Sequence, residues 1–161
     1  MFDSNFKIIR NFTNKTPTWD NFINHLNYAY GAGGNMIRIF ENYYFVVEVF
    51  DKDIEKTKHI YRDVYNIINK AHPDGIQERP VFLISLFENI ANLGAHIDPV
   101  DTIHWNCIGQ TLWKIYDENN NAQEYILNAG DLIYIKTGTK HDVTSLTPRA
   151  GITFASNPKH Q

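Results

Sequence analysis

Two stretches decide the fold: GAHIDPVDTIHWNCIGQTLWKIY at residues 94–116 and AGDLIYIKTGTKHDVTSLTPRAG at residues 129–151. Both consist of short segments in which apolar and polar residues alternate between glycines, a pattern typical of half-buried β-strands joined by tight turns. The first stretch contains His96 and Asp98, and the second contains His141. Because alternate residues of an extended segment share one face, these stretches predict a metal site in which two imidazoles and one carboxylate meet inside a β-barrel.

The segments around this site are short and numerous. From Pro80 onward the helical spacing of apolar residues is lost, and strand-like segments recur at intervals of about ten residues, which favours a sandwich or barrel. Together with an earlier hairpin they suffice for a mainly β fold with a double-stranded β-helix (jelly-roll) core. The predicted strands are 36–40, 43–50, 81–87, 95–98, 102–108, 111–117, 123–127, 131–136, 142–146 and 150–155.

Two amphipathic helices are predicted before these strands. Apolar residues recur at helical spacing over 18–30 and again over 53–71. Thr18 is a suitable N-cap residue of the first helix, the glycine-rich segment 31–34 is expected to end it, and Pro73 ends the second. Both helices are expected to pack on the outside of the barrel.

The length and composition allow one well-packed domain. The chain has 161 residues, of which 43% are hydrophobic and 20% are charged, so we expect a single domain spanning 1–161. Within it, residues 1–79 are expected to form a helix-strand-helix part that packs on the barrel. Residues 80–155 are expected to form the main jelly-roll strands and the metal site.

Composition also excludes several classes of partner. The net charge is −3, so neither a nucleic acid nor a membrane is an expected partner. Cys107 is the only cysteine, no apolar run is long enough to span a bilayer, and the N-terminus lacks the layout of a signal peptide. A cytoplasmic protein is therefore expected. Asn, Ile, Lys and Tyr are frequent, which is typical of AT-rich genomes such as those of some phages.

A His-x-Asp pair alone is weak evidence for a metal site, because the chain has seven histidines and 18 acidic residues. Two such pairs occur. His72 and Asp74 flank Pro73 at the end of the second predicted helix, where capping and turn roles explain them. His96 and Asp98 lie in an extended segment, where alternation directs both side chains to the same face.

The sequence around His141 strengthens the case for the second pair. Gly130, a strand, Gly138 and then His141 resemble the second motif of the cupin superfamily, with Lys136 where proline is usual. The first cupin motif is matched by His96-x-Asp98, but the glutamate of four-ligand cupins is missing. The resemblance therefore implies a three-ligand site, and two histidines with one carboxylate are the ligands of non-haem Fe(II) oxygenases.

More specifically, residues 94–116 and 130–154 resemble the JmjC-type branch of the Fe(II)/2-oxoglutarate-dependent oxygenases, which includes asparaginyl and ribosomal hydroxylases. This resemblance implies that His96, Asp98 and His141 hold Fe(II) and that 2-oxoglutarate and O2 are co-substrates. It also implies that hydroxylation of a C–H bond, in a protein side chain or a small molecule, is coupled to release of succinate and CO2.

Such an oxygenase requires a basic residue for the distal carboxylate of 2-oxoglutarate. In JmjC-type hydroxylases a lysine or arginine lies two residues before a tryptophan, and here Thr111 has that position. Lys114 is expected to point outward, because strand alternation puts it on the opposite face. Arg149 is our predicted ligand, since a guanidinium can bind a carboxylate through two hydrogen bonds, and Thr111 is expected to add a hydroxyl donor. Alternatively, Arg149 is an exposed charge in a turn after Pro148.

Alternation over 102–108 places Thr102, His104 and Asn106 on one face, which we expect to be the barrel interior. The resemblance then implies that Asn106 binds the metal-side carboxylate of 2-oxoglutarate. His104 is either a packed core histidine or a contact to substrate or metal. Cys107 is expected to be buried and unreactive.

The leading hypothesis is an Fe(II)/2-oxoglutarate-dependent hydroxylase. A second hypothesis, prompted by Thr111, is a metal-dependent cupin isomerase or dioxygenase that does not use 2-oxoglutarate. A third is a non-catalytic cupin-like binding or structural protein. The expected partners are O2 and an unidentified substrate, and a homodimer is a further state to test because barrels of this type often dimerise.

Overall fold

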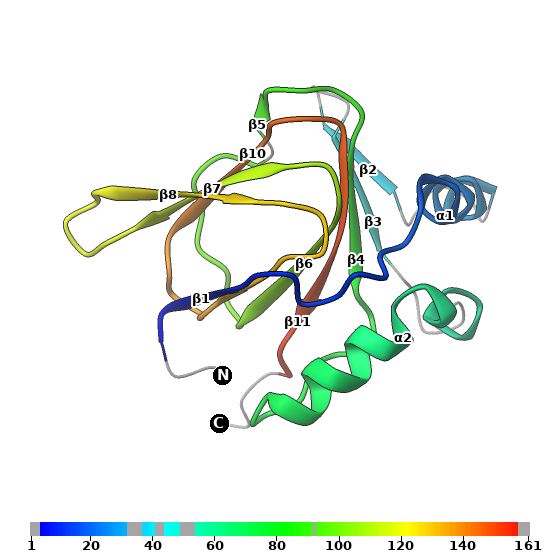
Figure 1. The fold of residues 1–161 in the computed structure, drawn as a ribbon, viewed down its shortest axis with the longest axis horizontal. Helices are drawn as coiled ribbons and strands as arrows, with labels where there is room; N and C mark the ends of the chain where they lie inside the picture. Colours follow the sequence, from blue (N-terminus) through cyan, green and yellow to red (C-terminus); the bar gives the residue numbers. More distant parts are fainter. Residues whose placement is uncertain (1–3, 32–36, 41–43, 49–53, 92, 158–161) are drawn as a thin grey trace.

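The computed structural model describes residues 4–31, 37–40, 44–48, 54–91 and 93–157. Within them, two antiparallel sheets face each other, and two helices lie outside the larger sheet (Figure 1). The elements are β1 (Phe6–Ile9), α1 (Trp19–Gly31), β2 (Ile37–Phe40), β3 (Tyr44–Glu48), α2 (Ile54–Ala71), β4 (Val81–Ser85), β5 (Ile90–Ala91), β6 (Thr102–Ile108), β7 (Thr111–Tyr116), β8 (Ala122–Leu127), β9 (Leu132–Ile135), β10 (His141–Ser145) and β11 (Arg149–Ala155).

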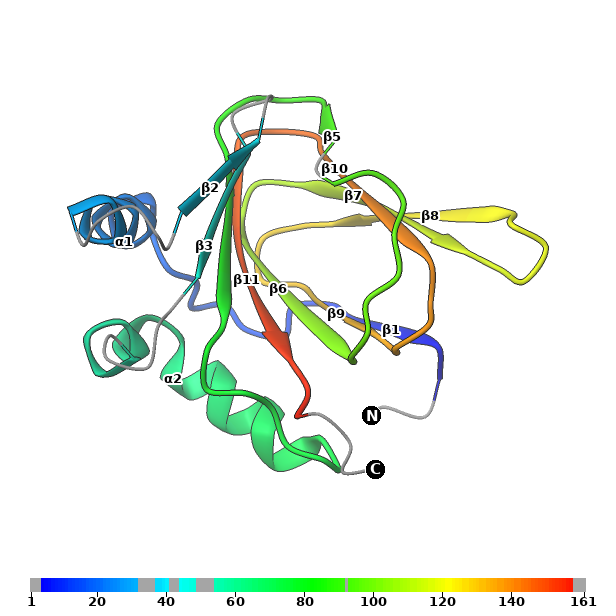
Figure 2. The same cartoon turned by 180° about the vertical axis from the view of Figure 1, so that it is seen from behind.

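The strand order shows the jelly-roll winding. The large sheet has the order β1-β9-β6-β11-β4-β3-β2, and the small sheet has the order β5-β10-β7-β8. Consecutive strands after β5 pass from one sheet to the other except at the β7–β8 hairpin, so the chain winds around a common interior (Figure 2). The predicted fold class, a mainly β double-stranded β-helix with two flanking helices, is confirmed.

The two faces of the large sheet bury different side chains. Along β6, Ile103, Trp105 and Cys107 pack into the core beneath the helices. The alternate residues of the same strand, Thr102 and His104 among them, face the small sheet, and every residue from Thr102 to Cys107 is buried. A strand covered on both faces therefore keeps strict alternation of apolar and polar side chains, because one face belongs to the core and the other to the barrel interior.

The helices cover the outer face of the large sheet. Tyr61 and Tyr65 of α2 make edge or tilted ring contacts with Phe154 of β11, and Tyr61 also contacts Phe82 of β4. The α2 stripe expected from helical spacing is thus the face that packs. None of the helices in the described parts of the chain is long and apolar enough to span a bilayer.

Thr18 precedes α1 and makes a contact typical of a helix cap, because its backbone N–H donates to Asn21 Oδ1 at 2.9 Å.

A smaller core fills part of the barrel between the sheets. Its buried members are Trp113, Ile115, Leu127, Ile133, Ile135 and Val143.

Several local predictions differ from the structure. Residues 95–98 do not form a strand: only His96 makes a β-bridge, to His141. The Asp98 carbonyl instead accepts hydrogen bonds from Thr137 and Gly138 in the turn after β9. No strand was predicted before the first helix, but β1 lies there and pairs with β9. Ser156, after the last predicted strand, is 5% exposed and bridges Ile76. The predicted positions 32–36, 43 and 49–53 lie outside the described residues.

Candidate metal centre

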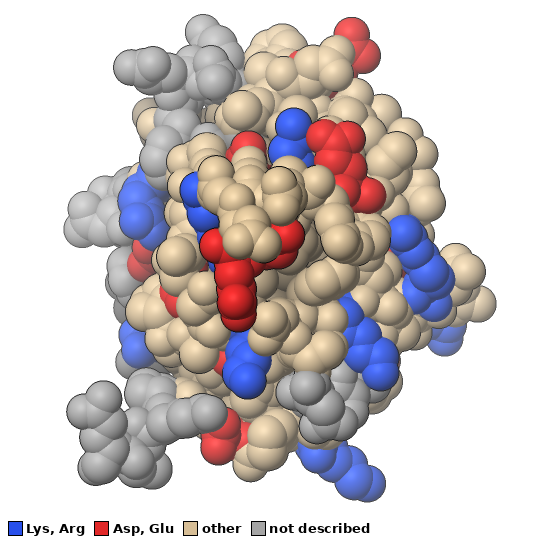
Figure 3. All heavy atoms as spheres, turned by 90° about the vertical axis from the view of Figure 1, so that its left-hand side faces the viewer, with Lys and Arg blue, Asp and Glu red and all other residues tan. Residues whose placement is uncertain are grey.

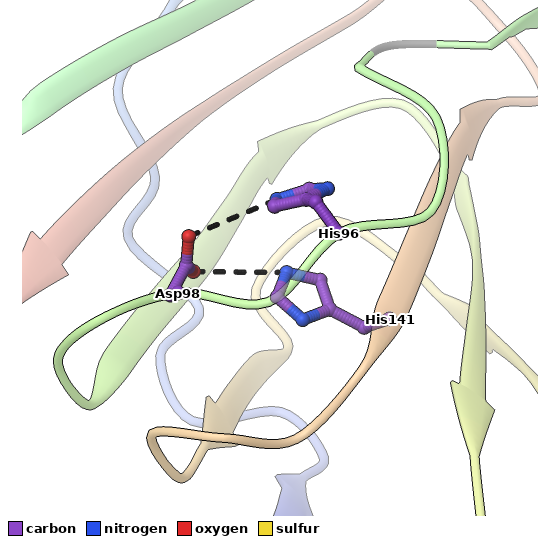
Figure 4. Close-up of side chains that lie close together, drawn as sticks. All are labelled: His96, Asp98 and His141. Atoms are coloured by element: carbon purple, nitrogen blue, oxygen red, sulfur yellow. Dashed lines mark ion pairs between the residues drawn. The ribbon is translucent and has the colours of Figure 1, made fainter.

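Three side chains converge at one end of the barrel interior (Figure 4). His96 and Asp98 come from the segment that precedes β6, and His141 is the first residue of β10. The backbones of His96 and His141 exchange two N–H···O hydrogen bonds of 2.9 Å. This antiparallel bridge places both imidazoles on the same side, with ring centroids 4.4 Å apart. The fold thus brings together two distant parts of the chain at the predicted position.

The geometry of the three side chains suits a metal ion. Asp98 Oδ1 lies 3.8 Å from His96 Nε2, and Asp98 Oδ2 lies 3.7 Å from His141 Nε2. These separations are too long for hydrogen bonds. A metal about 2.1 Å from each ligand atom would hold adjacent ligand atoms roughly 3 to 3.5 Å apart. One nitrogen or oxygen of each residue lies within 4.8 Å of the others, so small side-chain movements complete the site.

Hydrogen bonds orient both imidazoles toward this point. His96 Nδ1 lies 2.7 Å from the Gly94 carbonyl oxygen, and His141 Nδ1 lies 3.0 Å from the Thr139 carbonyl oxygen. A carbonyl only accepts, so each Nδ1 carries the proton and each Nε2 presents a lone pair. Burial, together with the neighbouring His96, lowers the pKa of His141 from its ordinary value. The neutral ligand form is therefore favoured at neutral pH.

Thr102 holds the carboxylate of the cluster. Its hydroxyl donates to Asp98 Oδ2 at 2.6 Å, which orients that oxygen and leaves Oδ1 available. Thr102 was predicted to face the interior, but its contact with Asp98 could not be read from the sequence because three residues of irregular backbone, 99–101, lie between the two.

A cavity of about 300 Å³ connects this cluster to Arg149. Arg149 is 0% exposed, and its Nε donates to Ser145 Oγ at 3.1 Å. Neither Nη1 nor Nη2 has a hydrogen-bond partner within the described ranges. Burial lowers the pKa of Arg149, against the effect of the adjacent Tyr44, but a guanidinium remains charged. The alternative of an exposed turn residue is wrong, and the cavity holds a buried cation with unused donors.

The other two predicted co-substrate residues are buried but are not among those that line this cavity. Asn106 Nδ2 donates to the Gly109 carbonyl at 2.8 Å, and Asn106 Oδ1 has no partner in the described structure. Thr111 Oγ1 accepts a 3.0 Å hydrogen bond from Trp113 Nε1. Thr111 therefore orients the tryptophan in this structure.

Lys114 points away from the barrel, as strand alternation predicts. Its Nζ lies 3.1 Å from Glu124 Oε1 on the neighbouring strand β8.

On the face of the molecule seen in Figure 3, basic and acidic side chains are interspersed rather than segregated. Arg38, Asp98 and Arg149 are the charged residues that line the cavity among those described.

Sequence reasoning missed two aromatic residues of the cavity as site residues. The Trp113 ring stacks against the His141 ring, with centroids 5.8 Å apart and planes at 21°. The Tyr44 ring centroid lies 5.4 Å from the Arg149 guanidinium carbon. Alternation indicated that Trp113 faces the same side as Thr111. Tyr44 gave no such signal, because its place beside Arg149 depends on pairing of β3, β4 and β11 across distant parts of the chain.

Two other residues considered from the sequence, His104 and Cys107, are buried within the fold. His104, 1% exposed, has its Nδ1 2.9 Å from Thr153 Oγ1 and lies against Trp113, whose ring centroid is 5.3 Å away. Burial, with the nearby Arg149, lowers the pKa of His104 well below its ordinary value. Cys107 is buried, and burial raises the pKa of its thiol well above its ordinary value, so it is not an activated nucleophile.

Fold and site together define a cupin-type jelly roll with a candidate three-residue metal centre. No protein-family model matches the chain, and no curated protein matches it. Solved structures do match. The ribosomal oxygenase YcfD from Escherichia coli aligns with a TM-score of 0.71 and 15% identity, over 99% of this chain and 49% of that chain.

A structure of YcfD with cobalt and 2-oxoglutarate aligns with a TM-score of 0.69 and 15% identity, over 99% of this chain and 50% of that one. Oxalate decarboxylase from Bacillus subtilis, described with Mn(II) centres, gives a TM-score of 0.53 and 15% identity, over 78% of this chain and 28% of that one. At such identities the similarity establishes the fold. The chain spans about half the length of the YcfD chains it matches.

Proposed function

We propose that this protein is a non-haem Fe(II)- and 2-oxoglutarate-dependent oxygenase that hydroxylates a C–H bond. The observation that carries the proposal is that one cavity contains both the His96/Asp98/His141 cluster and the buried Arg149, whose two Nη groups lack partners among the described residues. A cation without a counter-charge is costly to bury. A bound carboxylate would supply that counter-charge.

The donor set fits a metal of this type. Two neutral imidazoles and one carboxylate on a single side leave the remaining coordination positions open, which is the ligand set of non-haem Fe(II) oxygenases. When bound, Fe(II) would supply the redox chemistry that couples oxidative decarboxylation of 2-oxoglutarate to hydroxylation. His96, Asp98 and His141 would hold it, and the Gly94 and Thr139 carbonyls keep the two imidazoles in the required tautomer.

The remaining cavity residues bind the co-substrate and shield the site from water. Arg149 offers two N–H donors to the distal carboxylate of 2-oxoglutarate, and Ser145 holds the guanidinium by its Nε. Trp113, stacked on His141, and the apolar side chains of Leu83 and Val143 line the cavity. They exclude water from the space beside the metal ligands, which strengthens the electrostatic contacts there.

Binding experiments test this proposal directly. Wild-type protein is expected to bind Mn(II) and then 2-oxoglutarate in calorimetric titrations, and to release succinate from 2-oxoglutarate with Fe(II) in air. His141→Ala is expected to lose metal binding. Arg149→Met should keep Mn(II) affinity but lose 2-oxoglutarate affinity by about 30-fold or more, since a buried charged contact is worth several kcal/mol.

Lys114→Met is the matched control, because it removes a basic residue that points outward from β7 in the other sheet. It should leave both affinities unchanged. Wild-type protein that binds metal but no 2-oxoglutarate would contradict the proposal.

A second candidate is a metal-dependent cupin enzyme that acts on a carboxylate substrate without 2-oxoglutarate. The fold likeness to oxalate decarboxylase favours it. So does Thr111, which stands where JmjC-type hydroxylases have a lysine or arginine. Arg149 would bind any carboxylate. Substrate turnover without succinate release distinguishes it from the first candidate.

Four further assignments belong to the same proposal: Fe(II) as the metal in the cell, O2 as co-substrate, a cytoplasmic setting, and one domain over residues 1–161. The last is supported by β1, β3 and β2, which join the same sheet as strands from residues 81–155. Asn106 remains a proposed co-substrate residue through its unpartnered Oδ1.

A further inference from the structure

Asp101 is a buried carboxylate outside the metal cluster whose side chain contacts His72, Tyr134 and Thr137. The residue is 8% exposed. Its Oδ2 accepts a 2.9 Å hydrogen bond from the Tyr134 hydroxyl and lies 3.3 Å from His72 Nε2, while its Oδ1 accepts from the Thr137 backbone N–H at 2.9 Å. Its backbone N–H donates to Ser156 Oγ at 3.1 Å. One side chain thus joins the end of α2, β9 and the turn after β9.

That turn contacts both segments that carry metal ligands. The Thr137 hydroxyl donates to the Asp98 carbonyl at 3.2 Å, and the Gly138 N–H reaches the same carbonyl at 3.4 Å. Two residues further on, the Thr139 carbonyl accepts from His141 Nδ1 at 3.0 Å. The position of the turn therefore affects where Asp98 sits and how His141 is oriented.

We propose that Asp101 is a positioning residue for the metal centre, and that its carboxylate fixes the Thr137–Thr139 turn against the backbone of Asp98 and within hydrogen-bond reach of His141 Nδ1. The inference rests on the proposed function in that these ligands hold a metal. Asp101 itself lies behind the ligands: it acts through the turn and is not expected to touch a bound metal. Groups that orient metal ligands in this way typically change metal affinity by about 10- to 100-fold when they are removed.

The chain offers a matched carboxylate that lacks this connection. Asp131 is 2% exposed, accepts backbone N–H groups of Asn11 and Asn128 at 2.9 Å, and pairs with Arg10 at 2.7 Å. It precedes β9, whereas the Asp101-bound turn follows β9. Both aspartates anchor turns by similar hydrogen bonds, so loss of either should lower stability. We infer that, of these two aspartates, only Asp101 also determines the positions of the metal ligands.

The test compares Asp101→Ala and Asp131→Ala in two measurements. Mn(II) affinity, by calorimetry, is expected to fall about tenfold or more in Asp101→Ala and to stay at the wild-type value in Asp131→Ala. The visible absorption of bound Co(II), which reports ligand geometry, is expected to change only in Asp101→Ala. Asp101→Asn keeps an acceptor for the Thr137 N–H, and so it should recover most of the affinity.

Amide hydrogen exchange of the metal-free proteins provides the second measurement. The Gly138 and His141 amides bond to the Asp98 and His96 carbonyls, and they are expected to exchange faster in Asp101→Ala but not in Asp131→Ala. If Asp101→Ala does not fold, Thr137→Ala at an exposed position removes one of the two hydrogen bonds from the turn to the Asp98 carbonyl and should also weaken Mn(II) binding.

The outcomes separate the two proposals. Wild-type protein without any metal affinity would overturn the proposed function, and amide exchange would still decide the positioning role. Wild-type Mn(II) affinity and unchanged exchange in both the Asp101→Ala and Thr137→Ala variants would overturn the inference and leave the proposed function standing.

Discussion

The two faces of the large sheet use the same strands but bury different kinds of side chain. Toward the helices, Trp105, Phe82 and Phe154 form an apolar core, in which Trp105 Nε1 is a polar atom without a partner among the described residues. Toward the small sheet, His104 Nε2, Asn106 Oδ1 and both Nη atoms of Arg149 are buried without partners in the described part of the chain. Buried polar groups are normally paired, and among the described residues the charged group that is buried with polar atoms lacking a partner, the Arg149 guanidinium, lies on the inner face.

The largest expected effect lies on the outer face. Phe82→Ala removes a 0% exposed ring that contacts Phe22 and Tyr61, and it should lower the free energy of unfolding by about 3–5 kcal/mol. Leu83→Ala, one residue along the same strand, truncates a partly exposed side chain on the cavity wall and should cost clearly less. Urea denaturation of the two variants measures the contrast, and equal losses would contradict the assignment of the two faces.

A change of opposite sign is expected at Arg149. Without ligand, Arg149→Met removes a buried charge that lacks a counter-charge and should raise the free energy of unfolding by about 1 kcal/mol or more. In saturating Mn(II) and 2-oxoglutarate, the wild type should gain stability that the variant does not. Thermal melts with and without ligands check both statements. A variant that is less stable than the wild type in the absence of ligand would show that Arg149 belongs to the structural core.

The smallest effect concerns pH and His104. Its pKa in the folded protein is well below the ordinary value, so below about pH 6.5 the unfolded chain binds a proton that the folded protein does not, and stability falls as pH falls. Between about pH 6.5 and 5.5 this should cost about 1 kcal/mol. Over the same pH interval, the free energy of unfolding of His104→Gln, measured by urea denaturation, should therefore fall by about 1 kcal/mol less than that of the wild type. Parallel pH profiles would contradict a buried neutral histidine.

Alternation within strands was the strongest signal in the sequence. It correctly indicated the inward side of β6 and the outward direction of Lys114, because side-chain direction in a strand depends only on local backbone geometry. The same local logic placed His96 and Asp98 on one face, although the segment around His96 forms a single bridge rather than a strand. His141 was linked to them by the resemblance to the second cupin motif.

What the sequence could not provide depends on pairing between distant segments. The burial of Arg149 requires β11 to insert between β4 and β6, with an irregularity between Ala150 and Gly151. The alternatives for Arg149, a buried ligand or an exposed turn charge, could not be separated by local spacing. The contact of Asp101 with Thr137 joins residues that are far apart in the chain, and neither residue type suggests the other.

The position of β11 has a consequence for the order in which the molecule can be assembled. This strand follows every other described strand in the chain, yet it lies in the middle of the large sheet and hydrogen-bonds β6 on one side and β4 on the other. During synthesis, the edges of β4 and β6 that pair with β11 therefore stay unpaired until residues 149–155 have been made. Because such long-range pairings form slowly, we expect this part of the sheet, and with it the burial of Arg149, to form late.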